Sequence, residues 1–140
     1  MMTCFRAMGT SLLVLFCLAP AGCSTKTDVV QSETENLSKI RGAYEEAVAR
    51  LGRPPRNLNE LTPSLRKVGD PGELLRSRTG EPYEIVWGVN PRKFSQKASF
   101  PGIIAYEKTG VNGKHYVVTS MGVAPLADEE LSRIIAAQKQ

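Results

Sequence analysis

An apolar segment near the N-terminus, Ser11–Cys23 (SLLVLFCLAPAGC), decides which part of this chain is left to fold as a domain. Arg6 is the only charged residue before the segment, and the segment ends in small residues. A basic start, an apolar run and a small-residue end are the three parts of a secretory signal peptide. The run is shorter than the roughly 20 apolar residues that a membrane-spanning helix needs. We therefore expect residues 1–22 to be a signal peptide and the chain to be exported.

The end of this segment, Ala21-Gly22-Cys23, resembles the lipobox of bacterial lipoproteins, although Pro20 stands where that motif usually has leucine. The resemblance implies that Cys23 is acylated and becomes the first residue of the mature protein. The membrane is then a partner of the chain through this lipid anchor. The alternative is ordinary signal cleavage nearby, which leaves a soluble exported protein.

The polar residues 23–31 are expected to form a short lipidated tether between the membrane and the globular part, residues 32–140. Ser24 follows the cysteine at the position where aspartate favours retention in the inner membrane of some bacteria. By that rule of the lipoprotein family, we expect a protein that faces the periplasm, with the outer membrane favoured over the inner membrane.

The mature chain carries few of the residue types that catalysis and metal binding use. Cys4 and Cys17 lie in the signal segment, so Cys23 is the one cysteine left and no disulfide can form within the mature chain. His115 is the single histidine, which argues against a metal site of histidine and cysteine. The mature chain keeps all 14 acidic residues and all but one of the 18 basic residues, a mild excess without the dense basic stripe typical of nucleic-acid binding. We expect no metal, no cofactor and no nucleic-acid partner.

The pattern beyond the tether predicts a long helix over Glu33–Leu51, because apolar residues recur there at spacings of three and four. Ser32 and Glu35 have the spacing of a capping box at its start, and Pro54-Pro55 prevents its continuation. A single apolar stripe needs a partner, so we expect this helix to pack on a sheet. The residues expected in that contact are Ile40, Tyr44, Val48 and Leu51 on the helix, with Ile85, Trp87, Ile104 and Val117 on the sheet.

A leucine-rich segment follows the pair of prolines. Asn57 and Glu60 repeat the spacing of a helix cap at its start. Pro63 lies inside the segment, where proline removes a backbone donor and clashes with the preceding turn, so we expect two short turns rather than one helix. Leu74 and Leu75 are expected to enter the core from a loop or a single helical turn.

The rest of the chain predicts a small antiparallel sheet. Residues 83–87, 103–106 and 115–119 have the composition or alternation of strands. Residues 109–113 form a tight connection between the last two, because Asn112-Gly113 is a strong hairpin signal. Asp128 can cap a short C-terminal helix. We therefore expect an α+β fold: a long N-terminal helix on about three antiparallel strands, and a short helix at the C-terminus.

This order of parts resembles the globular part of the pseudopilins of type II secretion systems and of related pilin-like proteins. The segment RPPRNLNELTPSL, residues 53–65, carries the likeness best, and IIAYEKTGVNGKHYVVTSMGV, residues 103–123, resembles the end of pilin-like proteins. Met121-Gly122 stands where those proteins often have Asp-Gly. The resemblance covers about residues 37–131 and implies a pilin-like α+β domain.

The N-terminus departs from the pilin pattern. Pilins have a glycine followed by an apolar helix with glutamate at its fifth position, whereas the fifth residue after Gly9 is Val14. The first glutamate of the chain is Glu33. The resemblance therefore implies a fold and argues against the building of a filament.

Few side chains suggest a chemical site. No nucleophile or orienting carboxylate can be assigned to His115 from spacing, so we expect a structural or merely exposed histidine. Glu84 and Glu107 lie on strands that are expected to be neighbours, and they are the acidic pair that could converge in a pocket, where one pKa would rise. Trp87 and Tyr83 are expected in the core.

Arg92, Lys93 and Lys97 form a basic cluster with two phenylalanines nearby, and they are candidate contacts for an anionic partner. The alternative for this cluster is a solvated loop.

Because the sequence shows no Ser/His/Asp, Cys/His or metal constellation, we expect a protein without enzymatic activity. The expected function is that of a lipid-anchored envelope protein that presents its domain to a protein partner. Two alternatives stay open: a pseudopilin-like accessory subunit of a secretion or pilus system, and an enzyme or inhibitor that acts on the cell wall.

Overall fold

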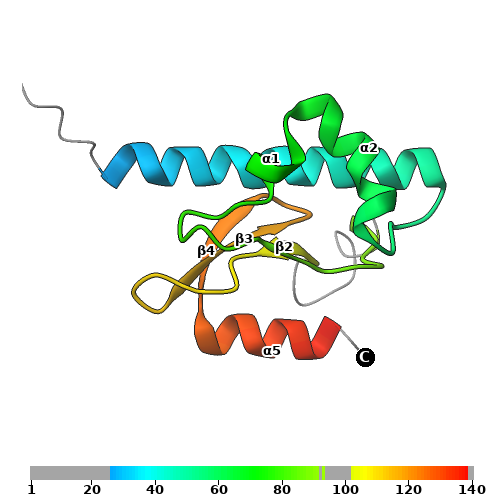
Figure 1. The fold of residues 1–140 in the computed structure, drawn as a ribbon. Coiled ribbons are helices and arrows are strands. Elements are labelled where there is room, and N and C mark those ends of the chain that lie inside the picture. Colours follow the sequence, from blue (N-terminus) through cyan, green and yellow to red (C-terminus); the bar gives the residue numbers. More distant parts are fainter. Residues whose placement is uncertain (1–25, 92, 94–101, 139–140) are drawn as a thin grey trace, which may run out of the picture.

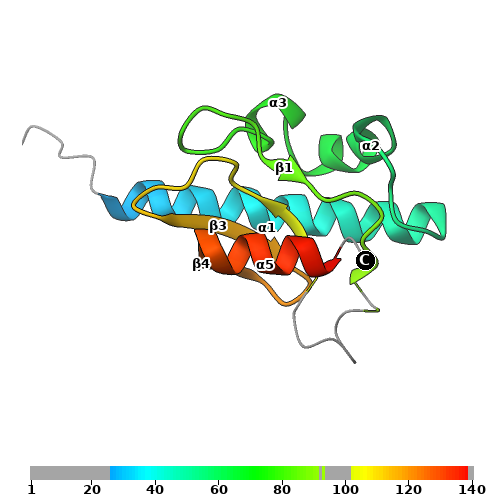
Figure 2. The ribbon, with the colours of Figure 1, turned by 90° about the horizontal axis from the view of Figure 1, so that it is seen from below.

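A long helix lies across one face of a four-stranded antiparallel sheet, and a shorter C-terminal helix covers the other face (Figures 1 and 2). The arrangement is that of a computed structural model, which describes residues 26–91, 93 and 102–138, with side chains from residue 31 onward. The predicted α+β class is confirmed, and the sheet has four strands in the order β1-β2-β3-β4 where about three were expected. In chain order the elements are α1 (Lys26–Leu51), α2 (Leu58–Val68), α3 (Pro71–Leu74), β1 (Glu84–Ile85), β2 (Ile103–Tyr106), β3 (Lys114–Thr119), β4 (Val123–Ala127) and α5 (Asp128–Gln138).

Helix α1 begins at Lys26, well before the predicted start at Glu33. Ser32 therefore lies inside the helix, and the predicted capping box with Glu35 is wrong. No glycine or proline lies in residues 26–32 to interrupt the helix, and the buried Glu33 holds this end against the body of the protein. The described part of the expected tether, residues 26–31, is thus helical, and residues 23–25 lie outside the described residues.

The main core lies between α1 and the sheet. Ile40 and Tyr44 are fully buried there together with Ile104, as the helical spacing predicts. Val48 and Leu51 are only half-buried, because the last two turns of α1 run beyond the centre of this contact toward α2. The apolar stripe of α1 is therefore confirmed as the face that packs on the sheet.

Two of the predicted sheet partners lie elsewhere. Trp87 is 38% exposed, because the paired part of β1 ends at Ile85 and the chain turns at Gly88, where φ is 79°. Val117 is buried on the opposite face of the sheet, in a second cluster with residues of α5, because neighbouring strand residues point to opposite faces. Its neighbour Val118 is the one that joins the core under α1.

The leucine-rich segment forms the single helix α2, and the prediction of two short turns is wrong. Asn57 caps the helix as predicted, since its side-chain oxygen accepts the backbone N–H of Glu60 over 3.1 Å. Pro63 lies inside the helix and is exposed. Proline removes one helical hydrogen bond, and the buried Leu61 and Leu65 compensate by holding the helix against α1.

Strands β2 and β3 form the predicted hairpin. Asn112 and Gly113 have φ values of 55° and 69°, which is the conformation that a two-residue hairpin turn requires. On either side of them, Val111 and Lys114 exchange two backbone hydrogen bonds of 2.9 and 3.2 Å. The Asn-Gly pair therefore sets the register of the hairpin.

Strand β4 was not predicted, because a proline and two alanines weaken its strand pattern. It pairs with β3 and forms an open edge of the sheet. Tyr116 of β3 lies opposite Pro125 and directs its carbonyl away from β4, to the N–H of Glu107. Since backbone groups alternate in direction along an antiparallel pair, the nitrogen of Pro125 faces the open edge, where it has no N–H to offer.

Candidate functional site

A group of polar side chains is enclosed between the N-terminal half of α1 and the segment that leads from α3 to β1. Glu33 projects into it from α1 and is only 4% exposed. It occupies the same face of the helix as the fully buried Leu37 and Ile40, four and seven residues further on. Glu33 therefore lies on the buried face of the helix, at a position where an apolar core side chain would be expected.

The partner of Glu33 is the hydroxyl group of Tyr83, which donates to Oε2 of the carboxylate. Burial raises the pKa of Glu33 above its ordinary value of 4.5, and the nearby carboxylate of Glu107 raises it further. The Tyr83 hydrogen bond and the charge of Arg78 act in the opposite direction. Burial and Glu33 also raise the pKa of Tyr83, so the phenol stays neutral and serves as the donor.

Below Glu33 lies an ion pair between Glu107 and Arg78. Glu107 is fully buried, and its Oε1 lies 2.8 Å from Nε of Arg78. Its Oε2 accepts from Nη2 of Arg78 over 3.0 Å and from the backbone N–H of Tyr116 over 2.6 Å. The guanidinium carbon of Arg78 lies 4.8 Å from the centre of the Tyr116 ring, which covers the pair. The carboxylate of Glu107 is thus held on both oxygens.

Glu84 does not take part in this group. It is exposed and lies opposite Tyr106 in the pairing of β1 with β2, so it does not meet Glu107 in a pocket. The acidic neighbour of Glu107 is Glu33 instead, 74 positions away in the sequence. No local sequence motif joins these two residues. The one sequence feature that could have indicated a buried Glu33 was its spacing of four residues from Leu37, which places both on the same face of the helix.

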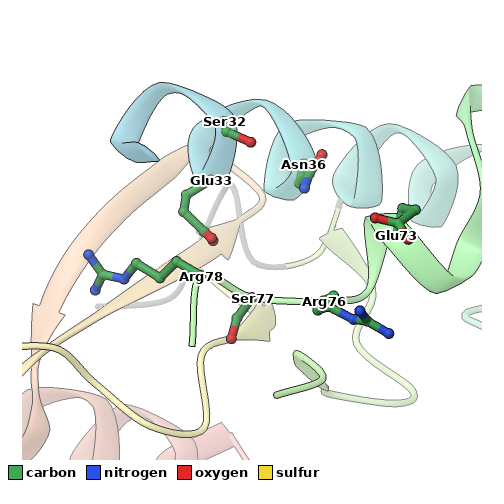
Figure 3. A pocket seen from close by; sticks show the side chains of 7 residues that line it. All are labelled: Ser32, Glu33, Asn36, Glu73, Arg76, Ser77 and Arg78. Carbon is green, nitrogen blue, oxygen red and sulfur yellow. The ribbon is translucent and has the colours of Figure 1, made fainter. Parts of the chain in front are cut away.

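A hollow of about 390 Å³ opens over this polar group (Figure 3). Glu33 points from α1 toward the segment below it, while Arg76 and Arg78 extend from that segment in opposite directions. Their guanidinium groups therefore lie to either side of the hollow. The residues that line it are Ser32, Glu33 and Asn36 of α1, Glu73 of α3, and Arg76, Ser77 and Arg78 of the following segment. We call this feature the Glu33 hollow.

His115 has a carboxylate partner that the spacing of the sequence could not assign. Its Nε2 contacts Oδ1 of Asp128 at the start of α5, and its Nδ1 lies 2.8 Å from the backbone carbonyl of Glu107. A carbonyl can only accept, so Nδ1 carries a proton. Gly110 makes room for the ring, since a Cβ atom there would lie 2.9 Å from Nε2. Each ring nitrogen has a partner within the protein, and the expected structural role of His115 agrees with this geometry.

The structure says little about the remaining predicted site residues. Cys23, Arg92 and Lys97 lie outside the described residues, and Lys93 is exposed. Within residues 26–91, 93 and 102–138, no group of three or more His, Cys, Asp or Glu side chains could hold a metal ion. In the same part of the chain, no helix combines the length and apolar character needed to cross a membrane.

Comparison of the chain with protein-family models, with curated proteins and with solved structures found no match.

Proposed function

We propose that this chain is a lipid-anchored protein of the bacterial cell envelope, and that its domain is a non-enzymatic module for contacts with other envelope proteins. The protein faces the periplasm, and the outer membrane is its favoured location. The proposal combines the lipobox-like end at Cys23 with the way in which the described domain uses its ionisable side chains.

The observation that carries the proposal is that the buried ionisable side chains form their hydrogen bonds and ion pairs with other groups of the domain. His115 has an acceptor near each ring nitrogen, Glu107 pairs with Arg78 and accepts the backbone N–H of Tyr116, and Glu33 accepts from Tyr83. General acid–base catalysis needs a group that can reach the proton of a substrate. These groups instead join α1, the sheet and α5, which favours a structural use and leaves the surface of the domain for binding.

A second candidate is a pseudopilin-like accessory subunit of a secretion or pilus system. It is favoured by the long helix that lies across an antiparallel sheet and by the hairpin between β2 and β3. Both candidates share a lipid anchor and a role in protein contacts. They differ in the partner that each requires.

The anchor is tested with Cys23→Ser, and Cys17→Ser is the matched control in the same apolar segment. We expect wild type and Cys17→Ser to take up a labelled fatty acid and to fractionate with membranes, because two or more acyl chains bind a bilayer stably. Cys23→Ser should take up no label and appear in the soluble fraction. A wild-type protein without label, together with a Cys23→Ser variant that stays with membranes, contradicts the lipid anchor.

The partner is tested by crosslinking in intact cells, followed by identification of the captured protein. A component of a secretion or pilus machine supports the second candidate, and another envelope protein supports the first. Hydrolysis of purified cell-wall material by the wild-type protein contradicts both, since neither includes an enzymatic activity.

A further inference from the structure

A second hollow, of about 590 Å³, opens on the face of the sheet that α5 covers. It lies between the C-terminal part of α5 and the chain from β1 to Val89. A volume of this size is within the range of small-molecule sites. The lining side chains that matter below are Glu84 of β1, Trp87 just after it, Tyr106 of β2, and Gln138 of α5. We call this feature the Trp87 hollow.

Contacts within the domain hold the walls of the Trp87 hollow in place. Gln138 is bonded through both ends of its amide to the backbone of Ile103: its Oε1 accepts the N–H over 2.9 Å, and its Nε2 donates to the carbonyl over 2.8 Å. On the other side, the backbone N–H of Gly88, next to Trp87, donates to the carbonyl of Pro55 over 3.1 Å. The hollow is therefore formed before any ligand arrives.

Three side chains of this hollow are polar and have no bonding partner. Glu84, Trp87 and Tyr106 form no side-chain hydrogen bond or ion pair within the part of the chain that the structure describes. Glu84 and Tyr106 lie opposite each other in the pairing of β1 with β2, so they share one face of the sheet. Glu84 and Trp87 are exposed. Burial raises the pKa of Tyr106, and the charge of Glu84 raises it further, so its hydroxyl stays neutral.

These three groups differ in the hydrogen bonds that they can form. The carboxylate of Glu84 only accepts, the indole N–H of Trp87 only donates, and the hydroxyl of Tyr106 does both. An apolar ligand would cover these groups without giving them partners, which is costly. A cationic amine has donors only, so it would leave the indole N–H unpaired. A ligand that serves all three needs groups that both donate and accept, beside an apolar face that can cover the aromatic rings.

We propose that the Trp87 hollow binds a sugar ring of an oligosaccharide. Each sugar hydroxyl both donates and accepts, which suits Glu84, Tyr106 and the indole N–H together. The C–H groups of a pyranose ring form an apolar face, and their weakly positive hydrogens are attracted to the negative face of an aromatic ring. The inference goes beyond the proposed function, because it gives the domain a second ligand that is not a protein.

The test is a titration of the full-length protein, purified in a detergent without a sugar headgroup, with chitotriose, cellotriose and maltotriose. Sorbitol has the hydroxyl groups without the ring, and Nα-acetyl-arginine N-methylamide is the cationic control. Trp87 is the single tryptophan of the chain, so its fluorescence reports on this hollow alone. We expect at least one trisaccharide to change this fluorescence saturably, to shift the NMR signals of Glu84 and Tyr106, and to bind about tenfold or more tightly than sorbitol.

Trp87→Ala is the decisive variant, and Leu58→Ala is its matched control, since it removes another exposed apolar side chain outside the hollow. Because Trp87 is exposed, the variant should fold, which its NMR spectrum will show. Followed through the signals of Tyr106, binding of the trisaccharide should weaken about tenfold or more in Trp87→Ala. It should weaken less in Trp87→Phe, which keeps an aromatic face, and stay unchanged in Leu58→Ala.

Three results overturn the inference: no saturable response to any of the three trisaccharides, equally tight binding of sorbitol, or unchanged binding in Trp87→Ala. Binding of the arginine amide in place of a trisaccharide also overturns it and identifies a cation site. None of these results affects the lipid anchor, because the Cys23→Ser fractionation measures that separately. Conversely, failure of the anchor test leaves the titration result standing as a property of the domain.

Discussion

Glu107 is bonded twice to one residue of the neighbouring strand: its backbone N–H donates to the carbonyl of Tyr116 over 3.0 Å, and its side-chain Oε2 accepts the N–H of Tyr116 over 2.6 Å. A carboxylate thus replaces a backbone carbonyl just beyond the end of β2 at Tyr106. The backbone carbonyl of Glu107 is left to accept from His115. One residue therefore connects the polar group under α1 with the start of α5 on the opposite face of the sheet.

The first prediction concerns the ion pair between Arg78 and Glu107. Arg78→Met should lower the free energy of unfolding by about 3–5 kcal/mol, because it leaves Glu107 charged and buried beside Glu33. Adding Glu107→Gln in the same chain should recover most of this loss, since an amide oxygen can still accept from Tyr116. Urea unfolding of the single and double variants measures both effects.

The control for this prediction is Lys67→Met, which breaks the exposed pair between Lys67 and Glu46, 2.7 Å apart. Exposed pairs contribute little, so its effect on stability should be much smaller than that of Arg78→Met. Equal losses in the two variants would show that the buried pair contributes no more than a surface pair.

The second prediction concerns the pH dependence of stability that Glu33 causes. Because the folded chain raises the pKa of Glu33 above 4.5, the folded state keeps this proton to a higher pH than the unfolded state does. The resulting stabilisation is complete below about pH 4.5 and is lost as the pH rises through the raised pKa. Glu33→Gln should therefore gain stability relative to wild type as the pH rises from 4.5 to neutral.

Thermal unfolding of both proteins at a series of pH values measures this difference. Glu45→Gln, on the exposed face of α1, serves as the control for the loss of one charge. A constant difference between wild type and Glu33→Gln across this range is the result that contradicts a raised pKa.

The third prediction compares two glycines. A Cβ atom at Gly110 would lie 2.9 Å both from Nε2 of His115 and from the backbone oxygen of Lys114, so Gly110→Ala should cost about 1–3 kcal/mol. Gly42 lies inside α1 with no atom within 4 Å of such a Cβ, so Gly42→Ala should instead stabilise the protein by about 0.5–1 kcal/mol.

The same substitution thus has opposite signs at the two positions, which chemical denaturation can show directly. The His115 ring signals should also shift in Gly110→Ala and stay in place in Gly42→Ala. If Gly110→Ala has the stability of the wild type and leaves the His115 ring signals unchanged, the ring does not lie close to Gly110.

The fourth prediction concerns the packing of α1 on the sheet. Ile40→Ala should lower the free energy of unfolding by about 2–5 kcal/mol, because Ile40 is fully buried in the main core. Leu58→Ala is the control at a position that is 43% exposed, and its effect should stay within about 1 kcal/mol. A melting temperature that Ile40→Ala leaves unchanged would count against this packing.

Much of the fold could be predicted because its signals are local. The 3.6-residue period identified the buried face of α1, and Asn112-Gly113 identified the hairpin with its two positive φ angles. The early start of α1 was missed because Ser32 and Glu35 have the spacing of a helix cap, although no glycine or proline before them interrupts the helix. The single helix α2 and the strand β4 were missed because tertiary contacts outweigh a local preference: Leu61 and Leu65 are buried on either side of Pro63, and β4 pairs with β3.

The candidate site was harder to predict, because its members come from distant parts of the chain. Glu33, Arg78 and Glu107 lie on three different elements or segments and share no motif. Asp128 was interpreted as a helix cap, yet its carboxylate contacts His115 across the sheet face. Spacing along the sequence could not show either convergence. The continuation of the apolar stripe to Glu33 was the one usable sign.

Pro125 at the open edge of β4 affects how closely copies of this domain can be held together on a membrane without joining their sheets. A lipid anchor would confine many copies to a plane, where edge strands meet far more often than they do in free solution. An exposed edge with all of its donors can template a further strand and so begin a fibril. Without an N–H at the middle of its open edge, β4 offers an interrupted template to the strand of a neighbouring copy.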